Sequence, residues 1–287
     1  MQQSDKVVRV ALLDMNNGYE NQGMGCIRKI VRGYLESHQY NYIVNEFDVR
    51  QKNEVPDTSY DIYVSSGGPG SPFDEEGWEW EHKFFKMIEK LYNYNLQAED
   101  GKKKYVFFIC HSFQLACRYF MIGNVCKRMS TSFGVFPITK VEEGLTEKLF
   151  QQLDNPFYAV DSRDYQVIEP DRWRLEELNA SILAIEKERP HVPLERAIMG
   201  IRFSPEMIGT QFHPEADAMG MRSHLLKDYI KEKVIAEHGE EKYYSMLEQL
   251  EDPDKILFTQ SVLLPAFLDQ ATEDIRKESQ LHVSDVK

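Results

Sequence analysis

The sequence predicts an α/β protein in which a mostly parallel sheet is covered by helices on both faces. Short runs of β-branched residues alternate with longer segments whose apolar residues recur at helical spacing. The 287 residues suffice for one large α/β domain or two modest ones, and 42% hydrophobic content is enough for a real core. In such a sheet functional residues collect where strands end, so a site is expected there.

The alternation begins near the N-terminus. Residues 7–14 predict a strand, a turn rich in Gly and Asn follows, and Met24, Ile27 and Val31 mark the apolar face of a helix. Two strands, an amphipathic helix, a strand and a helix are then predicted at residues 41–49, 60–66, 78–94, 104–109 and 111–122. This order indicates parallel strands joined by helices.

Beyond Gly134 the pattern changes to shorter extended pieces. They are predicted at residues 133–139, 156–160, 181–186, 196–203 and 206–212. We expect several of them to pair antiparallel at one side of the main sheet. A helix over residues 218–235 is then expected to close the domain.

The last fifty residues differ in character and predict two more helices. Asp252 is a plausible N-cap before the second helix, and Pro265 is expected to kink or split that helix. We therefore expect a domain over residues 1–235 and a C-terminal helical extension over residues 236–287. Its charge pattern leaves three roles open, namely a dimer surface, a lid and a dock for a partner.

Charge and cysteine content restrict the partners and the compartment. The net charge is -13 and the pI is near 5.2. Because this negative charge repels nucleic acid and anionic membranes at long range, neither is expected as a main partner. The four cysteines follow no scaffold spacing and the N-terminus lacks the apolar core of a signal peptide, so a reducing cytoplasm is expected. No apolar run approaches the roughly 18 residues of a membrane span. The histidines and cysteines show no metal-ligand spacing, and we expect neither a metal nor an organic cofactor.

Cys110 is the candidate nucleophile. It follows a run apolar enough for a central strand and precedes a helix, which is the arrangement of a nucleophile elbow. The positive end of the helix dipole favours the thiolate there, and Gln114 lies one turn further on the same helix face. A lone cysteine among apolar residues is more often simply buried, and that interpretation is kept for Cys26, Cys117 and Cys126.

His213 and Glu215 are the candidate base and its orienting group. They lie two residues apart, and Pro214 favours an extended segment on which both side chains project from one side. The imidazole would take the thiol proton and return one to the leaving amine, while the carboxylate fixes the tautomer. Alone, the segment would be interpreted as a solvated surface turn, but the pairing with Cys110 favours a triad.

A glycine loop supplies the third part. Residues 64–74 (VSSGGPGSPFD) end a strand in glycines, and attack on an amide creates an oxyanion that needs closely placed backbone N–H donors. The amide of His111 would be the second donor. Taken alone, GGPG is more often a plain turn, and it is not a phosphate loop because no Gly-Lys-Ser/Thr follows.

Three ordered motifs, SSGGPGSP, ICHSFQLA and GTQFHPE, make residues 7–235 resemble the class I glutamine amidotransferase family. Residues 132–138 also resemble the family's strand beside the glutamine pocket, and residues 161–167 resemble its SHxDxV segment. The resemblance implies a flavodoxin-like domain whose triad hydrolyses a glutamine side-chain amide through a thioester. It also implies the following site residues: Cys110, His213 and Glu215 for catalysis, Gly68 and His111 for the oxyanion, and Gly67, Gln114, Phe133 and Gly134 for the substrate.

The elbow departs from the family's G-x-C-x-G-x-Q pattern. Phe108 and Ser112 replace both glycines, and Arg163 stands where a histidine is common. His111 directly after Cys110 also resembles the Cys-His step of a related superfamily of proteases and chaperones. That second interpretation would leave the His-Pro-Glu segment unexplained.

Three functions therefore remain open. The leading hypothesis is a glutaminase of the amidotransferase type that acts on a small amide, glutamine, and passes ammonia to a separate synthase subunit, since no synthase domain is fused. The second is a γ-glutamyl or related amide hydrolase with the same triad. The third is a non-catalytic regulatory protein of the same fold, and a homodimer is compatible with each.

Overall fold

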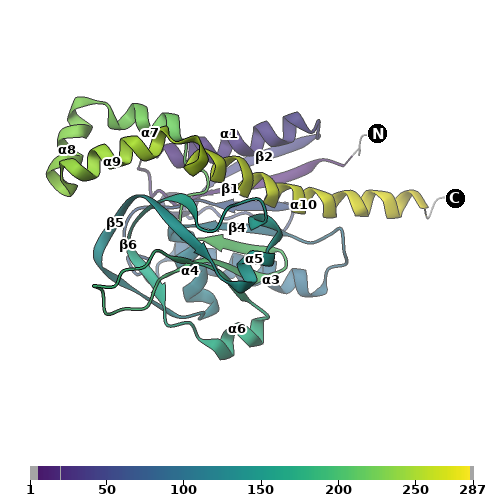
Figure 1. Cartoon of the computed structure of the whole chain (residues 1–287). Coiled ribbons are helices and arrows are strands. Elements are labelled where there is room, and N and C mark those ends of the chain that lie inside the picture. Colours follow the sequence, from purple (N-terminus) through teal and green to yellow (C-terminus); the bar gives the residue numbers. More distant parts are fainter. Residues whose placement is uncertain (1–5, 20, 285–287) are drawn as a thin grey trace.

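The strands form one curled sheet in the computed structural model, which describes residues 6–19 and 21–284, with side chains as far as residue 276 (Figure 1). The strand order is β2-β1-β3-β4-β9-β8-β7-β5-β6. The parallel strands are β2 (Tyr42–Asp48), β1 (Val8–Asp14), β3 (Ile62–Ser65), β4 (Tyr105–Ile109) and β9 (Met207–Thr210). The predicted mostly parallel α/β sheet is confirmed. Every residue of β4 is buried because this strand is central, between β3 and β9.

The other strands pair antiparallel beside β9, as the sequence predicts. They are β8 (Ile198–Ser204), β7 (Ser181–Glu186), β5 (Asn124–Lys140) and β6 (Phe157–Ile168). β5 is longer than the extended piece predicted at residues 133–139, and it includes Cys126. Its polar first half pairs with β6 and takes up the mismatch in a bulge between Lys127 and Ser132, so ladder pairing overrides local composition.

Helices cover both faces of the parallel strands. The bounds are α1 (Gln22–Ser37), α2 (Val49–Lys52), α3 (Glu79–Gln97), α4 (His111–Phe120), α5 (Glu142–Thr146), α6 (Arg172–Leu178), α7 (Ala218–Leu225), α8 (Asp228–His238), α9 (Glu240–Glu251) and α10 (Phe258–Ser284), with a 3₁₀ turn at Lys148–Phe150. α1 and α10 share a buried cluster with Phe107, whereas α3 and α4 share another with Phe108. Alternate residues of β4 therefore point to opposite layers.

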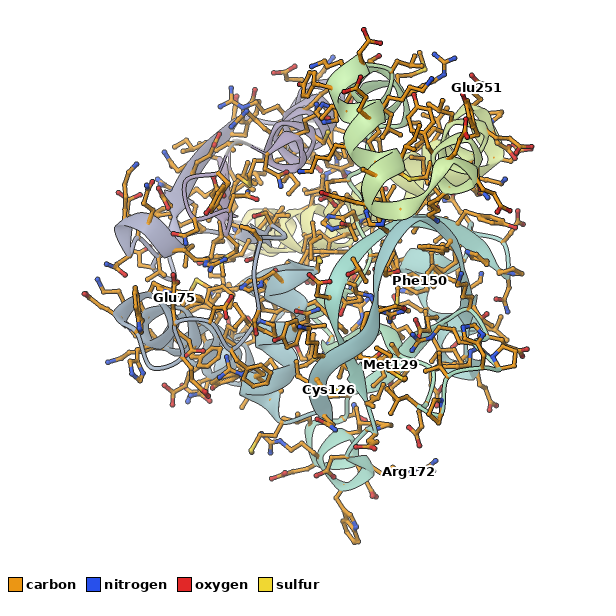
Figure 2. The ribbon with its side chains drawn as sticks, turned by 90° about the vertical axis from the view of Figure 1, so that its left-hand side faces the viewer. Glu75, Cys126, Met129, Phe150, Arg172 and Glu251 are labelled. Atoms are coloured by element: carbon orange, nitrogen blue, oxygen red, sulfur yellow. The ribbon has the colours of Figure 1, made fainter. Side chains whose placement is uncertain are left out.

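The predicted helix over residues 218–235 is two helices, α7 and α8, because the chain turns at Leu226 and Lys227. α8, α9 and the hairpin of β5 and β6 lie together, as Figure 2 shows between Glu251 and Met129. Asp252 is the expected N-cap, since its side chain accepts a hydrogen bond from the Asp254 amide, and it begins a π-helical turn at Pro253–Leu257. The interruption lies there, at Lys255, and α10 continues through Pro265.

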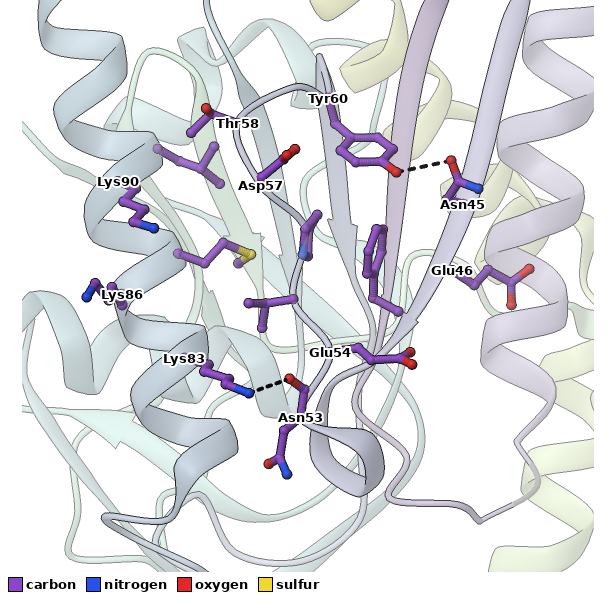
Figure 3. A pocket seen from close by; sticks show the side chains of 15 residues that line it. Asn45, Glu46, Asn53, Glu54, Asp57, Thr58, Tyr60, Lys83, Lys86 and Lys90 are labelled. Atoms are coloured by element: carbon purple, nitrogen blue, oxygen red, sulfur yellow. Dashed lines mark hydrogen bonds between the residues drawn. The ribbon is translucent and has the colours of Figure 1, made fainter.

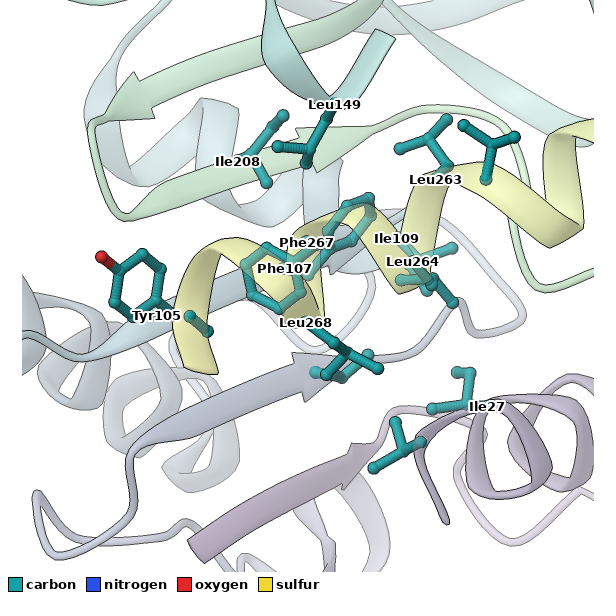
Figure 4. Packing of buried hydrophobic residues seen from close by; sticks show 14 of the residues in the cluster. Ile27, Tyr105, Phe107, Ile109, Leu149, Ile208, Leu263, Leu264, Phe267 and Leu268 are labelled. Carbon is teal, nitrogen blue, oxygen red and sulfur yellow. The ribbon is translucent and has the colours of Figure 1, made fainter. Parts of the chain in front are cut away.

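α10 is part of the main core. The ring of Phe267 meets that of Phe107 on β4 at a centroid distance of 5.2 Å, and Leu263 and Leu268 are completely buried beside it (Figure 4). These contacts hold the helix against the sheet and explain why Pro265 does not divide it. The division of the chain after residue 235 stays a prediction. No described helix combines the length and the apolar character that crossing a membrane requires.

Candidate active site

Cys110 stands at a sharp turn between β4 and α4. Its backbone has φ 50° and ψ −99°, a combination that costs an L residue about 1–3 kcal/mol. The Cys110 amide donates to the Thr210 carbonyl at 2.8 Å, and the Gln114 amide donates to the Cys110 carbonyl at 3.0 Å. These bonds to β9 and to the first turn of α4 hold the strained residue in place. The turn has the geometry of a nucleophile elbow.

The two unusual residues of the elbow are accommodated away from the thiol. The Ser112 hydroxyl accepts from the Ile109 amide at 2.9 Å and lies 2.9 Å from the Ser65 carbonyl, so it ties the end of β4 to β3. The Phe108 side chain points into the layer of α3 and α4. Gly209 gives it room, because a Cβ on that glycine would lie only 3.1 Å from the Phe108 Cβ.

His213 and Glu215 form a hydrogen-bonded pair. The distance from His213 Nδ1 to Glu215 Oε1 is 2.8 Å, and the Glu215 side chain is 3% exposed. The His213 amide donates to the Val160 carbonyl at 2.9 Å, and Gln260 of α10 donates to the Glu215 carbonyl at 3.0 Å. Strand β6 and helix α10 therefore position the pair from two sides.

The imidazole of His213 also faces the thiol of Cys110. A Cβ on Gly67 would lie 2.8 Å from His213 Cε1 and 3.4 Å from Cys110 Cβ, so this glycine lets both side chains meet. Burial lowers the pKa of His213, but the Glu215 charge and the charge and hydrogen bond of Cys110 outweigh it and hold the pKa well above its usual value. Because Nδ1 is engaged by Glu215, Nε2 is the nitrogen available for the thiol proton.

The two predicted oxyanion donors lie beside the nucleophile. Gly68 admits no side chain, because a Cβ would come within 2.2 Å of the Met15 carbonyl oxygen. Within the part of the chain that the structure describes, neither the Gly68 nor the His111 amide has a hydrogen-bond acceptor. Both N–H groups are therefore free to donate to a bound ligand.

The His111 side chain is unsuited to be the base. It is buried, and neither ring nitrogen has a partner among the described residues. Burial, together with the charges of Arg50 and Arg118, lowers its pKa to about 3. The ring is therefore neutral near pH 7 and lacks the orienting carboxylate that His213 has. The Cys-His interpretation is disfavoured on this ground.

These groups open into one cavity of about 590 Å³. The predicted residues in its wall are Cys110, His213, Glu215, Gly68, His111, Gln114, Phe133 and Gly134, while Gly67 lies behind His213. The Gln114 amide is held by the Gln211 side chain at 3.0 Å and the Tyr165 carbonyl at 3.3 Å.

The sequence did not indicate several other residues around the thiol and the cavity. Gln211 donates to the Cys110 sulfur at 3.6 Å, and that sulfur lies 3.8 Å from the Ser162 carbonyl. Gln211 lies in the motif that contains His213, which is a signal that could have found it. Met246 comes from α9 and closes one side of the cavity, and no local pattern marks it.

Arg163, where the family commonly has a histidine, is an internal ion-pair residue. Its Nε lies 2.8 Å from Asp161 and its Nη2 lies 3.2 Å from Glu186. Asp161 also accepts from the Ser132 hydroxyl at 2.7 Å. The guanidinium therefore fixes the pairing of β5, β6 and β7 beside the cavity.

A second, larger hollow lies away from the elbow, between α3 and the chain that leads into β3 (Figure 3). Its volume is about 780 Å³, and lysines 83, 86 and 90 form one side. Neither a cysteine nor a histidine lines it, so it offers no nucleophile and base pair. Across the described ranges, no three His, Cys, Asp or Glu side chains gather as a metal site.

Comparisons with known proteins bear on the family and the fold of the chain. The family model "Glutamine amidotransferase class-I" matches residues 21–233. The crystal structure of a glutamine amidotransferase from Thermotoga maritima has a TM-score of 0.66 at 17% identity, covering 93% of this chain and 99% of that chain. A glutamine amido transferase from Methylobacillus flagellatus gives 0.55 at 11% identity, with 96% and 95% covered. The glutaminase domain of Trypanosoma brucei CTPS with bound acivicin gives 0.53 at 14% identity, with 73% and 86% covered.

Among curated proteins none matches the sequence significantly. The likeness to the solved structures confirms the predicted fold class, an α/β domain with a curled, partly parallel sheet and a C-terminal helix.

Proposed function

The chain belongs to the class I glutamine amidotransferase family, and we propose that it hydrolyses the side-chain amide of glutamine with Cys110 as the nucleophile. One observation carries the proposal. The His213 imidazole and the side chain of the strained elbow residue Cys110 lie on the same side of Gly67, close to one another, and the imidazole is oriented by Glu215 at 2.8 Å. A nucleophile, its base and the base's orienting group are the parts that acyl transfer needs.

In the first step His213 Nε2 holds the thiol proton while the Cys110 sulfur attacks the side-chain carbonyl carbon of glutamine. A C–S bond forms and the carbonyl oxygen becomes an oxyanion, which the amides of Gly68 and His111 stabilise. Losing one such donor typically lowers the rate roughly 100- to 1000-fold. The free state of both amides supports this role.

In the second step the C–N bond breaks. His213 gives its proton to the leaving nitrogen, so that ammonia departs and a glutamyl thioester remains on Cys110. Water then attacks the thioester while His213 accepts a proton from it, and glutamate leaves as the sulfur regains a proton. Glu215 stabilises the imidazolium at both stages without being protonated.

The direct test uses acivicin, the compound bound in the Trypanosoma brucei glutaminase domain. We expect it to label Cys110 stoichiometrically and excess glutamine to protect the residue, as measured by mass spectrometry of the peptide. Cys110→Ser should lose ammonia release while keeping a cooperative unfolding transition. Cys117→Ser, in the buried face of α4, is the control that should keep activity. Unchanged glutamine hydrolysis by Cys110→Ser would contradict the assignment.

A γ-glutamyl amide is the second candidate substrate. The cavity of about 590 Å³ lies within the 300–1000 Å³ that receives ligands much larger than a single amino acid. Protection of Cys110 by γ-glutamyl compounds and not by glutamine would favour this candidate. If neither acivicin nor any γ-glutamyl analogue that reacts with thiols labels Cys110, a non-catalytic role is favoured.

Transfer of the ammonia to a separate acceptor protein, and a cytoplasmic location, stay predictions. If a synthase subunit is the acceptor, the rate of ammonia release should depend on that subunit and on its bound substrate.

A further inference from the structure

Two lysines beside the cavity lack a carboxylate partner. Lys242 comes from α9 and Lys187 follows β7, and each ammonium nitrogen lies 4.2 Å from the ring centroid of Phe136. Within the described part of the chain neither lysine has a carboxylate at ion-pair distance. The contact with the ring stabilises each ammonium only partly. Two neighbouring ammonium groups are therefore left without a direct ion-pair partner among the described residues.

The nearby acidic groups are already engaged. Glu186 is shared by three arginines, Arg128 at 3.0 Å, Arg163 at 3.2 Å and Arg189 at 2.8 Å. Asp161 is occupied by Arg163 and by Ser132. This region is therefore cationic in a chain whose net charge is -13, and it favours an anionic ligand.

The Lys242 ammonium lies against Gly134, a residue of the cavity wall. It occupies the space of the missing side chain of Gly134, because a Cβ there would lie 2.5 Å from Lys242 Nζ. Gly134 lines the cavity, and the preceding residue, Phe133, pairs with Ser162, whose carbonyl is 3.8 Å from the Cys110 sulfur. One strand spacing from β5 to β6 and the contact of Ser162 with the sulfur together put the ammonium roughly 10 Å from the sulfur.

This separation fits the length of the proposed substrate. In glutamine the carboxylate carbon and the side-chain amide carbon are four bonds apart, about 5 Å. An approach of about 3 Å between sulfur and carbon and a hydrogen bond of about 3 Å from the ammonium complete a span of roughly 11 Å. Burial and the Lys187 charge lower the pKa of Lys242, and a carboxylate would relieve both effects.

We propose that Lys242, with Lys187 beside it, is a specificity-determining residue that binds a carboxylate of the substrate at the rim of the cavity. The inference rests on the proposed function and extends it. Helix α9 lies outside the residues 21–233 that the family model matches, so the subsite is contributed by the C-terminal helices. Two carboxylates have the required chemistry, the α-carboxylate of the glutamyl group and that of an amino acid released from a γ-glutamyl compound.

Lys242→Met tests the proposal with two pairs of substrates. If the α-carboxylate is bound, the variant should raise KM for L-glutamine roughly 10- to 100-fold, the usual factor for losing a hydrogen bond to a charged group, and leave KM for L-glutaminamide unchanged. If the carboxylate of the leaving amino acid is bound, the variant should raise KM for γ-glutamylglycine by the same factor and leave KM for γ-glutamylglycinamide unchanged. Lys242→Arg should keep much of the preference because it keeps the charge.

Lys231→Met is the matched control. Lys231 also lies over aromatic rings, at 5.6 Å from those of Tyr243 and Tyr244, but neither ring belongs to a residue that lines the cavity. Lys231→Met should change neither the ratio of KM for L-glutamine to KM for L-glutaminamide nor the corresponding ratio for γ-glutamylglycine and γ-glutamylglycinamide. The proposal is overturned if Lys242→Met affects the acid and the amide of each pair equally or affects none of them.

A binding measurement separates this proposal from the proposed function. Calorimetric titration of Cys110→Ser with L-glutamine and L-glutaminamide measures binding at the subsite without turnover. Adding Lys242→Met should weaken the binding of L-glutamine and leave that of L-glutaminamide unchanged. If the wild-type protein releases no ammonia, the proposed function fails, yet this comparison still decides the subsite. The subsite is overturned if Cys110→Ser binds none of the four compounds, L-glutamine, L-glutaminamide, γ-glutamylglycine and γ-glutamylglycinamide.

Discussion

At the scale of single residues, Ser112 stands where the family usually has a glycine, and its hydroxyl joins the ends of β4 and β3 by hydrogen bonds. It satisfies the buried Ile109 amide at 2.9 Å. We expect Ser112→Ala to leave that donor unsatisfied and to lower the free energy of unfolding by about 1–3 kcal/mol, as measured by urea denaturation. Ser261→Ala, which removes an exposed hydroxyl that donates to the Phe258 carbonyl, should change it by less than about 0.5 kcal/mol. Equal small effects would show that the elbow does not depend on the hydroxyl.

The raised pKa of His213 gives a pH-dependent prediction. The pKa of His213 is higher in the folded state than in the unfolded state, where it is about 6.5. The resulting stabilisation is fully present at pH values below the unfolded-state pKa, and it is lost as pH rises through the folded-state pKa. Glu215→Gln removes the largest interaction that raises the pKa. The stability gap between wild type and variant should therefore be widest near about pH 6 and should narrow as pH rises.

Urea unfolding of both proteins at several pH values measures this gap. Glu237→Gln is the control, because the exposed Glu237 lies 3.8 Å from His238 in a solvated pair and should show no such trend. A gap that widens with pH would reverse the sign and refute the charged His213–Glu215 pair.

The residues of the candidate triad could be placed from sequence because each sits in a short local motif. A cysteine between strand and helix, and a histidine two before a glutamate, need only local geometry to be recognised. Lys242 and Met246 could not be found in this way, since their position depends on how α9 packs against β5. Gly209, which makes room for Phe108, was equally invisible before the register of β4 and β9 was known.

At the scale of elements, α10 supports the strand that leads into Cys110. Phe267 is completely buried against Phe107 of β4. We expect Phe267→Ala to lower the free energy of unfolding by about 3–5 kcal/mol, because it removes a large ring and leaves a cavity. Phe258→Ala, at the 37%-exposed start of the same helix, is the control with a small effect. Similar effects of the two substitutions would contradict the role of α10 as core.

Element types followed from hydrophobic periodicity, but element ends often did not. The length of β5 depends on a partner strand, and the turn between α7 and α8 follows from packing around Tyr243, which donates to the Leu225 carbonyl at 3.0 Å. The continuity of α10 through Pro265 likewise reflects burial, since tertiary contacts offset the lost helical hydrogen bond.

At the scale of the whole molecule, the predicted division after residue 235 can be tested by truncation. Removing the later residues would uncover the apolar face of β4 and β1 that α10 covers. We expect a chain ending at residue 235 to lose its cooperative thermal transition and its near-ultraviolet circular dichroism. A truncated chain that melts cooperatively would establish residues 1–235 as an independent domain.

The same packing orders events during synthesis. The ribosome completes Cys110, His213 and Glu215 well before it makes α10, and until that helix emerges β4 has no cover on one side. A nascent chain can therefore contain Cys110, His213 and Glu215 and still lack the helix that packs against β4, the strand before Cys110. If Cys110 is the nucleophile, as proposed above, we expect hydrolysis only after α10 has packed against β4.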